Sequence, residues 1–472
     1  MTLLLFCAKV LALKAKSRKT NAASVLPQSA AMERMVSLEN AQKKTLWLRI
    51  RENTLSFMES VKSGPDFPYI ILVICYVFSE YVNRIYWTGD LFSSSRLNFF
   101  NYIVLLGSGV YLCYKAAMWK KLRNMPLLLV PVILAVGCLC GYFLMFLDQD
   151  WKNHKIVFTV IIDCFLCLMA YGKNFKKLLR FLLFVPITIL LIAGLGLLAG
   201  FTQDFSKVGD QYSSTSLGII YPNTWGYIAF QAMLAGWYVY LRKKPLLTFA
   251  MFWPIGVFMY FVIGCRTIAF LSLAFPMITL LTSWMEKREQ RPEKLPRKKP
   301  GLISWFAIAL PVLCCLGSVV LSLNKEWVAM TFYNTPLHST AMRFVQGGLA
   351  LDYFGFSLFG RPMRIATQIY LDKSTGVVEH LYVMDNAYIS FMITKGVLWV
   401  ACCLAWLIFG QWRGWKNRDY SMLLIASFMV FFAVMERPGM EVWYNFALLY
   451  PLASIAEPII KRTAKKEKKS AE

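Results

Sequence analysis

The sequence predicts an all-α, polytopic integral membrane protein with about 12 transmembrane helices, both termini in the cytoplasm and one large extracytoplasmic loop. Its composition is the first reason, because 57% of the 472 residues are hydrophobic and only 16% are charged, which is too apolar for a soluble core. Apolar runs recur along the chain, and clusters of Lys and Arg fill alternate connections between them. One long polar segment, 325–386, interrupts the runs.

A helix needs about 20 apolar residues to cross the hydrocarbon core. Runs of roughly this length predict one transmembrane domain over 68–460, between a basic amphipathic segment, 1–67, and a basic tail, 461–472. The first segment begins with a short apolar run followed by basic residues, and we expect it to lie on the inner membrane face. The predicted spans are 68–86, 99–117, 126–146, 155–172, 180–200, 217–241, 245–263, 266–284, 302–324, 387–410, 420–436 and 440–460.

The distribution of Lys and Arg predicts the orientation of these spans. Basic tracts occupy every second connection, whereas the other connections carry few basic residues for their length. By the positive-inside rule, both termini and the basic tracts are cytoplasmic, and the remaining connections, including 325–386, lie outside. The basic tracts are 115–123, 173–180, 242–244, 286–299, 413–418 and 461–469.

Charge and cysteine content exclude several other classes of protein. The formal net charge of +25 comes from short clusters between apolar runs, so we expect no nucleic-acid partner. The 12 cysteines are scattered through apolar spans and predict no disulfide framework. Cys164 and Cys167 lie in one such span and are interpreted as packing residues. His338 and His380 lack the spacing of a zinc site, so we expect neither a metal nor another cofactor.

The long outer segment, 325–386, is rich in aromatic and aliphatic residues, which favours an ordered structure. Met342, Val345, Leu349 and Tyr353 recur at helical spacing and predict an amphipathic helix at the outer membrane interface.

Ionisable and amide side chains collect at the predicted outer ends of the spans. Because placing such groups near the hydrocarbon core costs free energy, each is a candidate functional residue. For each, an interfacial anchor or a structural ion pair is the alternative to a functional role. The residues are Arg266, Arg343, Asp385, Asn386, Glu436, Arg437 and Glu441.

Two further polar groups fall inside predicted spans. Pro222 and Asn223 lie about one turn into the sixth span, where proline would break the helix and leave the Asn223 amide facing a cavity. A kink packed by neighbouring helices is the alternative. Asp163 lies in mid-span, and either a proton or ion relay or a hydrogen bond to a neighbouring helix would account for it.

Three local patterns, in this order and topology, resemble the O-antigen polymerase and O-antigen ligase family of bacterial membrane glycosyltransferases. Segment 217–226, LGIIYPNTWG, resembles its glycine-(aromatic)-x-(His/Asn)-Pro-Asn stretch, and Cys265-Arg266-Thr267 resembles its Ser-Arg-(small) turn. Asp385-Asn386 with Gly396 resembles its His-Asn-x9-Gly pattern, and segment 339–360 resembles its loop helix. The resemblance covers roughly residues 200–450. Two departures are Asp385 in place of histidine and no arginine just before the sixth span, for which Lys207 or Arg343 would substitute.

The resemblance implies polymerisation of undecaprenyl-pyrophosphate-linked repeat units at the outer face of the bacterial plasma membrane, in capsule or exopolysaccharide synthesis. The reaction would need neither metal nor nucleotide sugar. Arg266 and Arg343 would bind phosphate oxygens, and Asp385 would take the proton of the acceptor hydroxyl. Sugar binding and helix capping are the alternatives for Asp385. The expected substrate-binding residues are Asn386, Asn223, Lys207, Glu436 and Arg437.

The expected partners are the lipid-linked oligosaccharide, membrane lipids, and the flippase and chain-length regulator of the same pathway. A ligase that hands finished glycan to another acceptor is one alternative function. A flippase for lipid-linked oligosaccharides is another, but it requires charges along a cavity open to both sides, whereas the charges here crowd the outer mouth.

Overall fold

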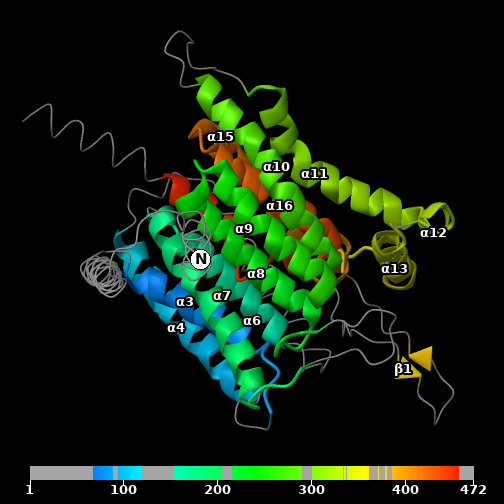
Figure 1. Ribbon diagram of the computed structural model, residues 1–472, viewed down its shortest axis with the longest axis horizontal. Coiled ribbons are helices and arrows are strands. Elements are labelled where there is room, and N and C mark those ends of the chain that lie inside the picture. The colour runs from blue at the N-terminus through cyan, green and yellow to red at the C-terminus, as the bar shows by residue number, and fades with distance from the viewer. Residues whose placement is uncertain are drawn as a thin grey trace, which may run out of the picture. The chain divides into compact units, whose positions relative to one another are not determined.

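The computed structural model describes most of the predicted transmembrane domain as a bundle of helices (Figure 1). The predicted N-terminal segment, 1–67, lies outside the described residues except for Phe67, and the bundle belongs to the unit Pro68–Glu472. The predicted third span, 126–146, and the basic tail, 461–472, lie outside the described residues. The described residues are 67–88, 94–118, 154–171, 173–204, 215–289, 300–332, 334–335, 337–360, 370–371, 378–379 and 385–455.

Helices make up most of the described chain, and its strands form one small antiparallel hairpin, β1 (Tyr370–Leu371) with β2 (Val378–Glu379). The helices are α3 (Phe67–Val82), α4 (Ser94–Met118), α6 (His154–Met169), α7 (Phe175–Leu198), α8 (Pro222–Gly236), η5 (Trp237–Leu241), α9 (Pro245–Phe258), η6 (Met259–Ile263), α10 (Arg266–Glu289), α11 (Leu302–Leu323), α12 (Lys325–Phe332), α13 (His338–Phe354), α14 (Ala387–Thr394), α15 (Val397–Lys416), α16 (Tyr420–Met435), η7 (Arg437–Met440) and η8 (Phe446–Leu449).

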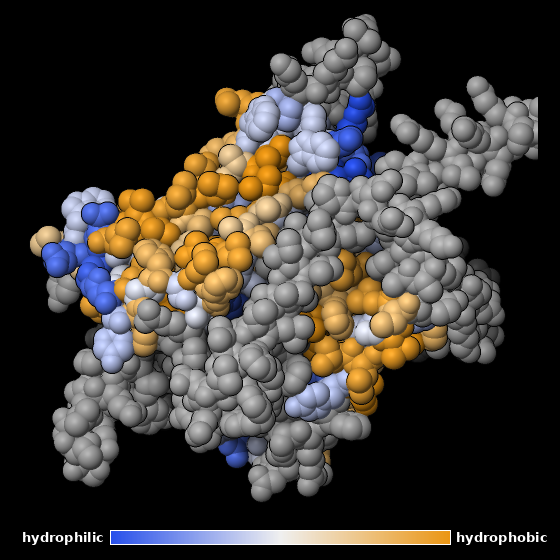
Figure 2. Space-filling model, turned by 180° about the vertical axis from the view of Figure 1, so that it is seen from behind, coloured by the Kyte–Doolittle hydropathy of each residue, from blue (hydrophilic) through white to orange (hydrophobic). Residues whose placement is uncertain are grey.

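Four of these helices are long and apolar enough to cross a membrane: α7, α9 with η6, α11 and α15. Their outward side chains are apolar; Leu195 is 61% exposed and Phe261 75%. Figure 2 shows broad apolar areas on one face of the molecule. Such an exterior is expected where lipid replaces water. The prediction of a helical membrane protein is therefore supported, whereas the number of spans and their sides stay predictions.

Contacts between connections define two ends of the bundle. At one end, Arg242 after η5 pairs with Asp419 before α16 at 3.3 Å, and both belong to connections predicted to be cytoplasmic. At the other end, the connection after α3 forms bridges to two later connections, through Ile85 with Ile219 and through Trp87 with Thr202. We call this second end the outer end, after its predicted side.

The sixth predicted span differs from expectation at its start. Helix α8 begins at Pro222, and Tyr221 is an extended N-cap. The prediction that Pro222 breaks this helix is wrong, because proline at the first helical position lacks only an N–H that would have no partner there.

The tenth predicted span, 387–410, is two helices rather than one. Helix α14 ends at Thr394, and α15 starts at Val397. Gly396 between them has φ +96°, and a Cβ there would lie 2.3 Å from the Leu358 carbonyl oxygen. This glycine lets the extended segment after α13 approach, and the Ser357 carbonyl of that segment accepts from the Val397 N–H at 2.9 Å.

The helix predicted in the outer loop is confirmed as α13, which lies at the end of α11, at the edge of the bundle (Figure 1), whereas its place at a membrane interface stays a prediction. Its buried side carries small residues that allow close packing, since a Cβ at Gly348 would lie 2.1 Å from the Ser322 carbonyl oxygen of α11. Leu349 and Tyr353 of the predicted apolar stripe stay 44% and 72% exposed, as a stripe facing a membrane interface would be.

Candidate functional site

Arg343 lies at the centre of a partly buried ion network at the outer end. Its Nη2 is 2.7 Å from Glu436 Oε1, and its Nε is 3.6 Å from Asp385 Oδ2. Its Nη1 donates a hydrogen bond to the Met435 carbonyl oxygen. The side chain is 15% exposed. Arg343 therefore joins α13 to the start of α14 and to the end of α16.

Tyr227 adds a fourth element to this network. Its hydroxyl donates to Glu436 Oε2 from α8, and its ring packs edge-on against Phe432 at 5.3 Å between centroids. Glu436 lies just beyond the end of α16, where it is 3% exposed. Its two carboxylate oxygens are thus held by different helices, α8 and α13.

The two carboxylates bound to Arg343 have different surroundings. Burial raises the pKa of Glu436 to about 7, opposed by the charge of Arg343 and reinforced by that of Asp385. Burial alone would lower the pKa of Arg343, but Glu436 and Asp385 outweigh it and raise this pKa above its ordinary value. Asp385 is the accessible member, with its side chain 37% exposed against 4% for Glu436.

Asn386, next to Asp385, has its side chain bonded within the protein. Its Oδ1 accepts from the Ile389 N–H at 3.2 Å and so caps α14. Its Nδ2 donates to Ser318 Oγ of α11 at 2.9 Å. The residue is 1% exposed. Asn386 therefore performs the capping role that was an alternative for Asp385, and its contribution to substrate binding stays a prediction.

Asn223 and Arg266 start neighbouring helices that the structure packs against each other. Both side chains are exposed, on the first turns of α8 and α10. Cys265 joins them, because its Sγ lies 3.9 Å from the Asn223 carbonyl oxygen. A Cβ at Gly226 would lie 2.6 Å from the same sulfur. The first two sequence patterns thus form one surface.

Helices α8 and α10 begin at the outer end, and neither has an acidic residue in its first turn. The first N–H groups of a helix lack partners within it, and the helix dipole places partial positive charge there. With the exposed Arg266, these starts make the outer end suited to an anionic ligand.

Two of the predicted site residues cannot be placed. Lys207 lies outside the described residues, and so does the side chain of Arg437, whose backbone begins η7. In the part of the chain that the structure describes, no group of three or more His, Cys, Asp or Glu is arranged to hold a metal ion.

Sequence reasoning missed Tyr227 and Arg84. Tyr227 follows Asn223 by one helical turn, which could have indicated a shared face. Arg84 lies just after α3, and its guanidinium carbon is 5.1 Å from the centre of the Trp443 ring. The sequence could have indicated Arg84, because it is a basic residue in a predicted outer connection that has few basic residues.

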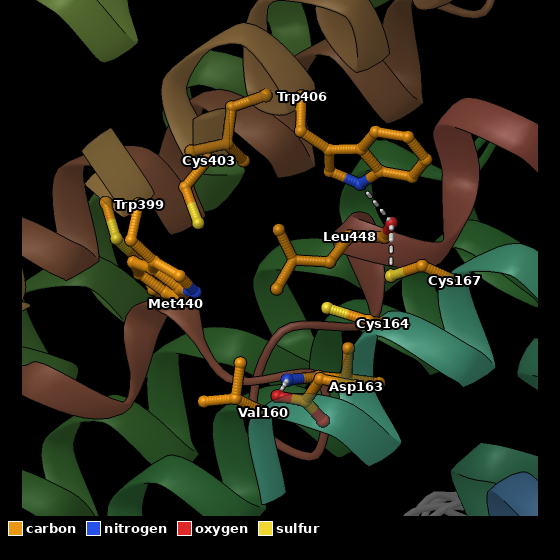
Figure 3. A pocket seen from close by; sticks show the side chains of 11 residues that line it. Val160, Asp163, Cys164, Cys167, Trp399, Cys403, Trp406, Met440 and Leu448 are labelled. Atoms are coloured by element: carbon orange, nitrogen blue, oxygen red, sulfur yellow. Dashed lines mark hydrogen bonds between the residues drawn. The ribbon is translucent and has the colours of Figure 1, made fainter. Parts of the chain in front are cut away.

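Asp163 is separate from the ion network and has the partner that the sequence left open. Its Oδ2 accepts a hydrogen bond from the Val442 N–H at 3.2 Å. It lines a pocket of about 50 Å³ between α6, α15 and the segment after α16, together with Cys164, Cys167 and Trp399 (Figure 3). This is the hydrogen bond to a neighbouring element that the sequence offered as one alternative, and a proton or ion relay stays a prediction.

Comparisons of the chain with protein-family models, with curated proteins and with solved structures find no match. The resemblance to O-antigen polymerases and ligases therefore stays a prediction.

Proposed function

We propose that this protein polymerises undecaprenyl-pyrophosphate-linked oligosaccharide repeat units at the outer face of a bacterial plasma membrane. The observation that carries the proposal is the convergence of Asp385, Arg343 and Glu436 at the outer end. It joins the loop helix α13 to α8, α14 and α16. The grouping of predicted outer connections at this end supports an extracytoplasmic site.

The chemistry of the donor fits a site of this charge. A sugar that leaves as a lipid pyrophosphate develops negative charge on phosphate oxygens. The exposed Arg266 can bind those oxygens bidentately without losing its proton. The N-termini of the neighbouring helices add partial positive charge at fixed positions, which also attracts phosphate oxygens. No step requires a metal or a nucleotide sugar.

Asp385 is the general base in this proposal. The acceptor hydroxyl attacks the anomeric carbon of the donor sugar, the bond from that carbon to the pyrophosphate oxygen breaks, and Asp385 takes the hydroxyl proton. Its accessible side chain can reach a sugar hydroxyl, whereas Glu436 is enclosed. The ion pair with Arg343 orients Asp385.

Arg343 acts differently from the sequence-based expectation. Its guanidinium already has three acceptors, on Glu436, Asp385 and Met435. It therefore positions the two carboxylates, and the phosphate-binding role falls to exposed arginines such as Arg266.

The test is the distribution of lipid-linked sugars across the membrane in cells whose only copy carries Asp385→Asn. We expect single repeat units to accumulate on the outer face, with no polymer. The matched control is Asp352→Asn, which removes an exposed acid of α13 that pairs with Lys325 at 2.5 Å, and which should leave polymer unchanged.

Two other outcomes would contradict the proposal. Single units trapped on the cytoplasmic face would indicate a flippase. Finished chains left on the lipid carrier, with normal chain length, would indicate a ligase.

A further inference from the structure

The ion network already engages three of the five N–H donors of Arg343, which favours other arginines as the ligands of the pyrophosphate. Arg343 is held by two carboxylates and a carbonyl oxygen. A pyrophosphate carries two phosphoryl groups, and each is bound best by a planar guanidinium that offers two parallel N–H donors. If Arg266 binds one group, a second arginine at the outer end is needed.

Arg84 can supply this second guanidinium, because no acceptor in the described part of the protein bonds its N–H groups. Among the described residues, its guanidinium makes neither a hydrogen bond nor an ion pair, and its side-chain contact is the stacking on Trp443 at 5.1 Å. The ring is 3% exposed and packed against Tyr444 at 3.8 Å between centroids, so it is a rigid platform. Stacking on one face leaves the N–H edge of the guanidinium open.

The backbone fixes Arg84 beside the start of α8. The Arg84 carbonyl oxygen accepts from the Ile220 N–H at 2.7 Å, and the Tyr86 N–H donates to the Gly218 carbonyl at 2.9 Å. The segment thus paired with Arg84 leads directly into Pro222 and Asn223. Arg84 lies on the same end of the bundle as Asn223 and Arg266.

A row of packed aromatic side chains connects Arg84 to the ion network. Trp443, under Arg84, packs on Tyr444, and Tyr444 packs edge-on against Tyr227 at 5.5 Å. Tyr227 in turn bonds Glu436. Each link is a direct contact or a hydrogen bond, so the Arg84 guanidinium has a fixed position relative to Glu436.

The nearby acids do not neutralise Arg84. Glu80, one turn earlier on α3, is 2% exposed and accepts from Asn101 Nδ2 at 2.5 Å. Glu441 lies two residues before Trp443 in the chain, and it makes no ion pair with Arg84 within the described part of the protein. An arginine that stacks on a buried ring and has no acceptor for its donors among the described residues is suited to a ligand with phosphate oxygens.

We propose that Arg84 binds a phosphoryl group of the lipid-pyrophosphate donor and positions that donor relative to Asp385. This inference rests on the proposed function for the identity of the donor. The binding chemistry itself, a phosphate on an arginine stacked on Trp443, does not depend on it.

The first experiment measures the binding of inorganic pyrophosphate to the full chain in phosphatidylcholine nanodiscs. We expect saturable binding by the wild type and a dissociation constant about tenfold higher or more for Arg84→Gln, the loss expected for a charge-assisted pair. Arg84→Lys should recover part of the affinity, because it keeps the charge but not the bidentate edge. Thermal unfolding of each variant checks that it is folded.

The matched control is Lys416→Gln, which removes a cation stacked on Trp412 at 4.7 Å at the opposite end of the bundle. It should bind pyrophosphate as the wild type does. No saturable binding by the wild type, an Arg84→Gln affinity within twofold of the wild type, or an equal loss in Lys416→Gln would each overturn the inference.

The second experiment separates the substrate from bilayer lipid as the source of the phosphate. With lipid-linked repeat units as substrate, Arg84→Gln should raise KM far more than it lowers kcat. The inference would be overturned by two results together: loss of pyrophosphate binding when the nanodiscs contain phosphatidylglycerol, and an unchanged KM in Arg84→Gln. These results would instead show that Arg84 binds a lipid headgroup.

The two proposals can fail independently. Polymer formation that depends on Asp385 but not on Arg84 would overturn the role of Arg84 and leave the function intact. Pyrophosphate binding that depends on Arg84, in a protein that forms no polymer, would overturn the function and leave the phosphate site intact.

Discussion

Glu436→Gln should change how stability depends on pH, because Glu436 is an acid enclosed beside a single strong cation. Its pKa of about 7 lies above its ordinary value of 4.5, so the folded state favours the protonated carboxyl. This contribution is fully present below about pH 4.5 and is lost as the pH rises through about 7. At about 1.4 kcal/mol per pKa unit, ionisation of Glu436 costs the folded state about 3 kcal/mol.

Glutamine has the same shape, accepts from Tyr227 and does not ionise. The stability of Glu436→Gln relative to the wild type should therefore increase by about 3 kcal/mol between pH 4.5 and pH 8. Arg343 keeps Asp385 and the Met435 carbonyl as partners, so the variant should still fold.

The assay is unfolding of both proteins by sodium dodecyl sulfate in mixed micelles, across this pH range. Asp352→Asn serves as the control, because an exposed acid should leave the pH profile unchanged. A constant difference between Glu436→Gln and the wild type at all pH values would refute the reasoning. It would mean that Glu436 does not titrate in this range.

Two other substitutions test the local structure around the site. Gly396→Ala should destabilise the protein by about 2 kcal/mol or more, because the φ of +96° is strained for alanine and its Cβ would meet the Leu358 carbonyl. Gly317→Ala in α11, where a Cβ meets nothing within 4 Å, should be neutral or stabilising; equal losses would contradict the account. Asn386→Ala should cost about 1–2 kcal/mol in detergent unfolding, and Asn386→Asp should recover the cap, whereas an unchanged stability in Asn386→Ala would contradict the capping role.

The sequence was informative where the signal is local. Apolar runs predicted the positions of most helices, and the spacing of Met342, Val345, Leu349 and Tyr353 predicted α13, because burial and helical periodicity are written in neighbouring residues. The three patterns also indicated which helix N-termini carry candidate site residues. Two of those starts, at Asn223 and Arg266, are adjacent in the structure.

The sequence could not indicate pairings between distant residues. Tyr227 and Glu436 are 209 positions apart, and neither pattern nor spacing relates them. The break at Gly396 depends on a segment, 357–360, that lies before a long stretch of outer loop. The start of α8 was misplaced for a different reason: a proline is compatible with both a helix interior and a first turn, and the apolar run before it placed the proline inside the predicted helix.

The central claim is that Asp385, held by Arg343, is the base of a metal-independent polymerisation. The most direct measurement incubates the purified full chain in nanodiscs with lipid-linked repeat units and excess chelator, and records chain length together with released undecaprenyl pyrophosphate. The account predicts a ladder of products with one pyrophosphate released per linkage for the wild type and Asp352→Asn, and no ladder for Asp385→Asn. A ladder of equal rate from Asp385→Asn would contradict it.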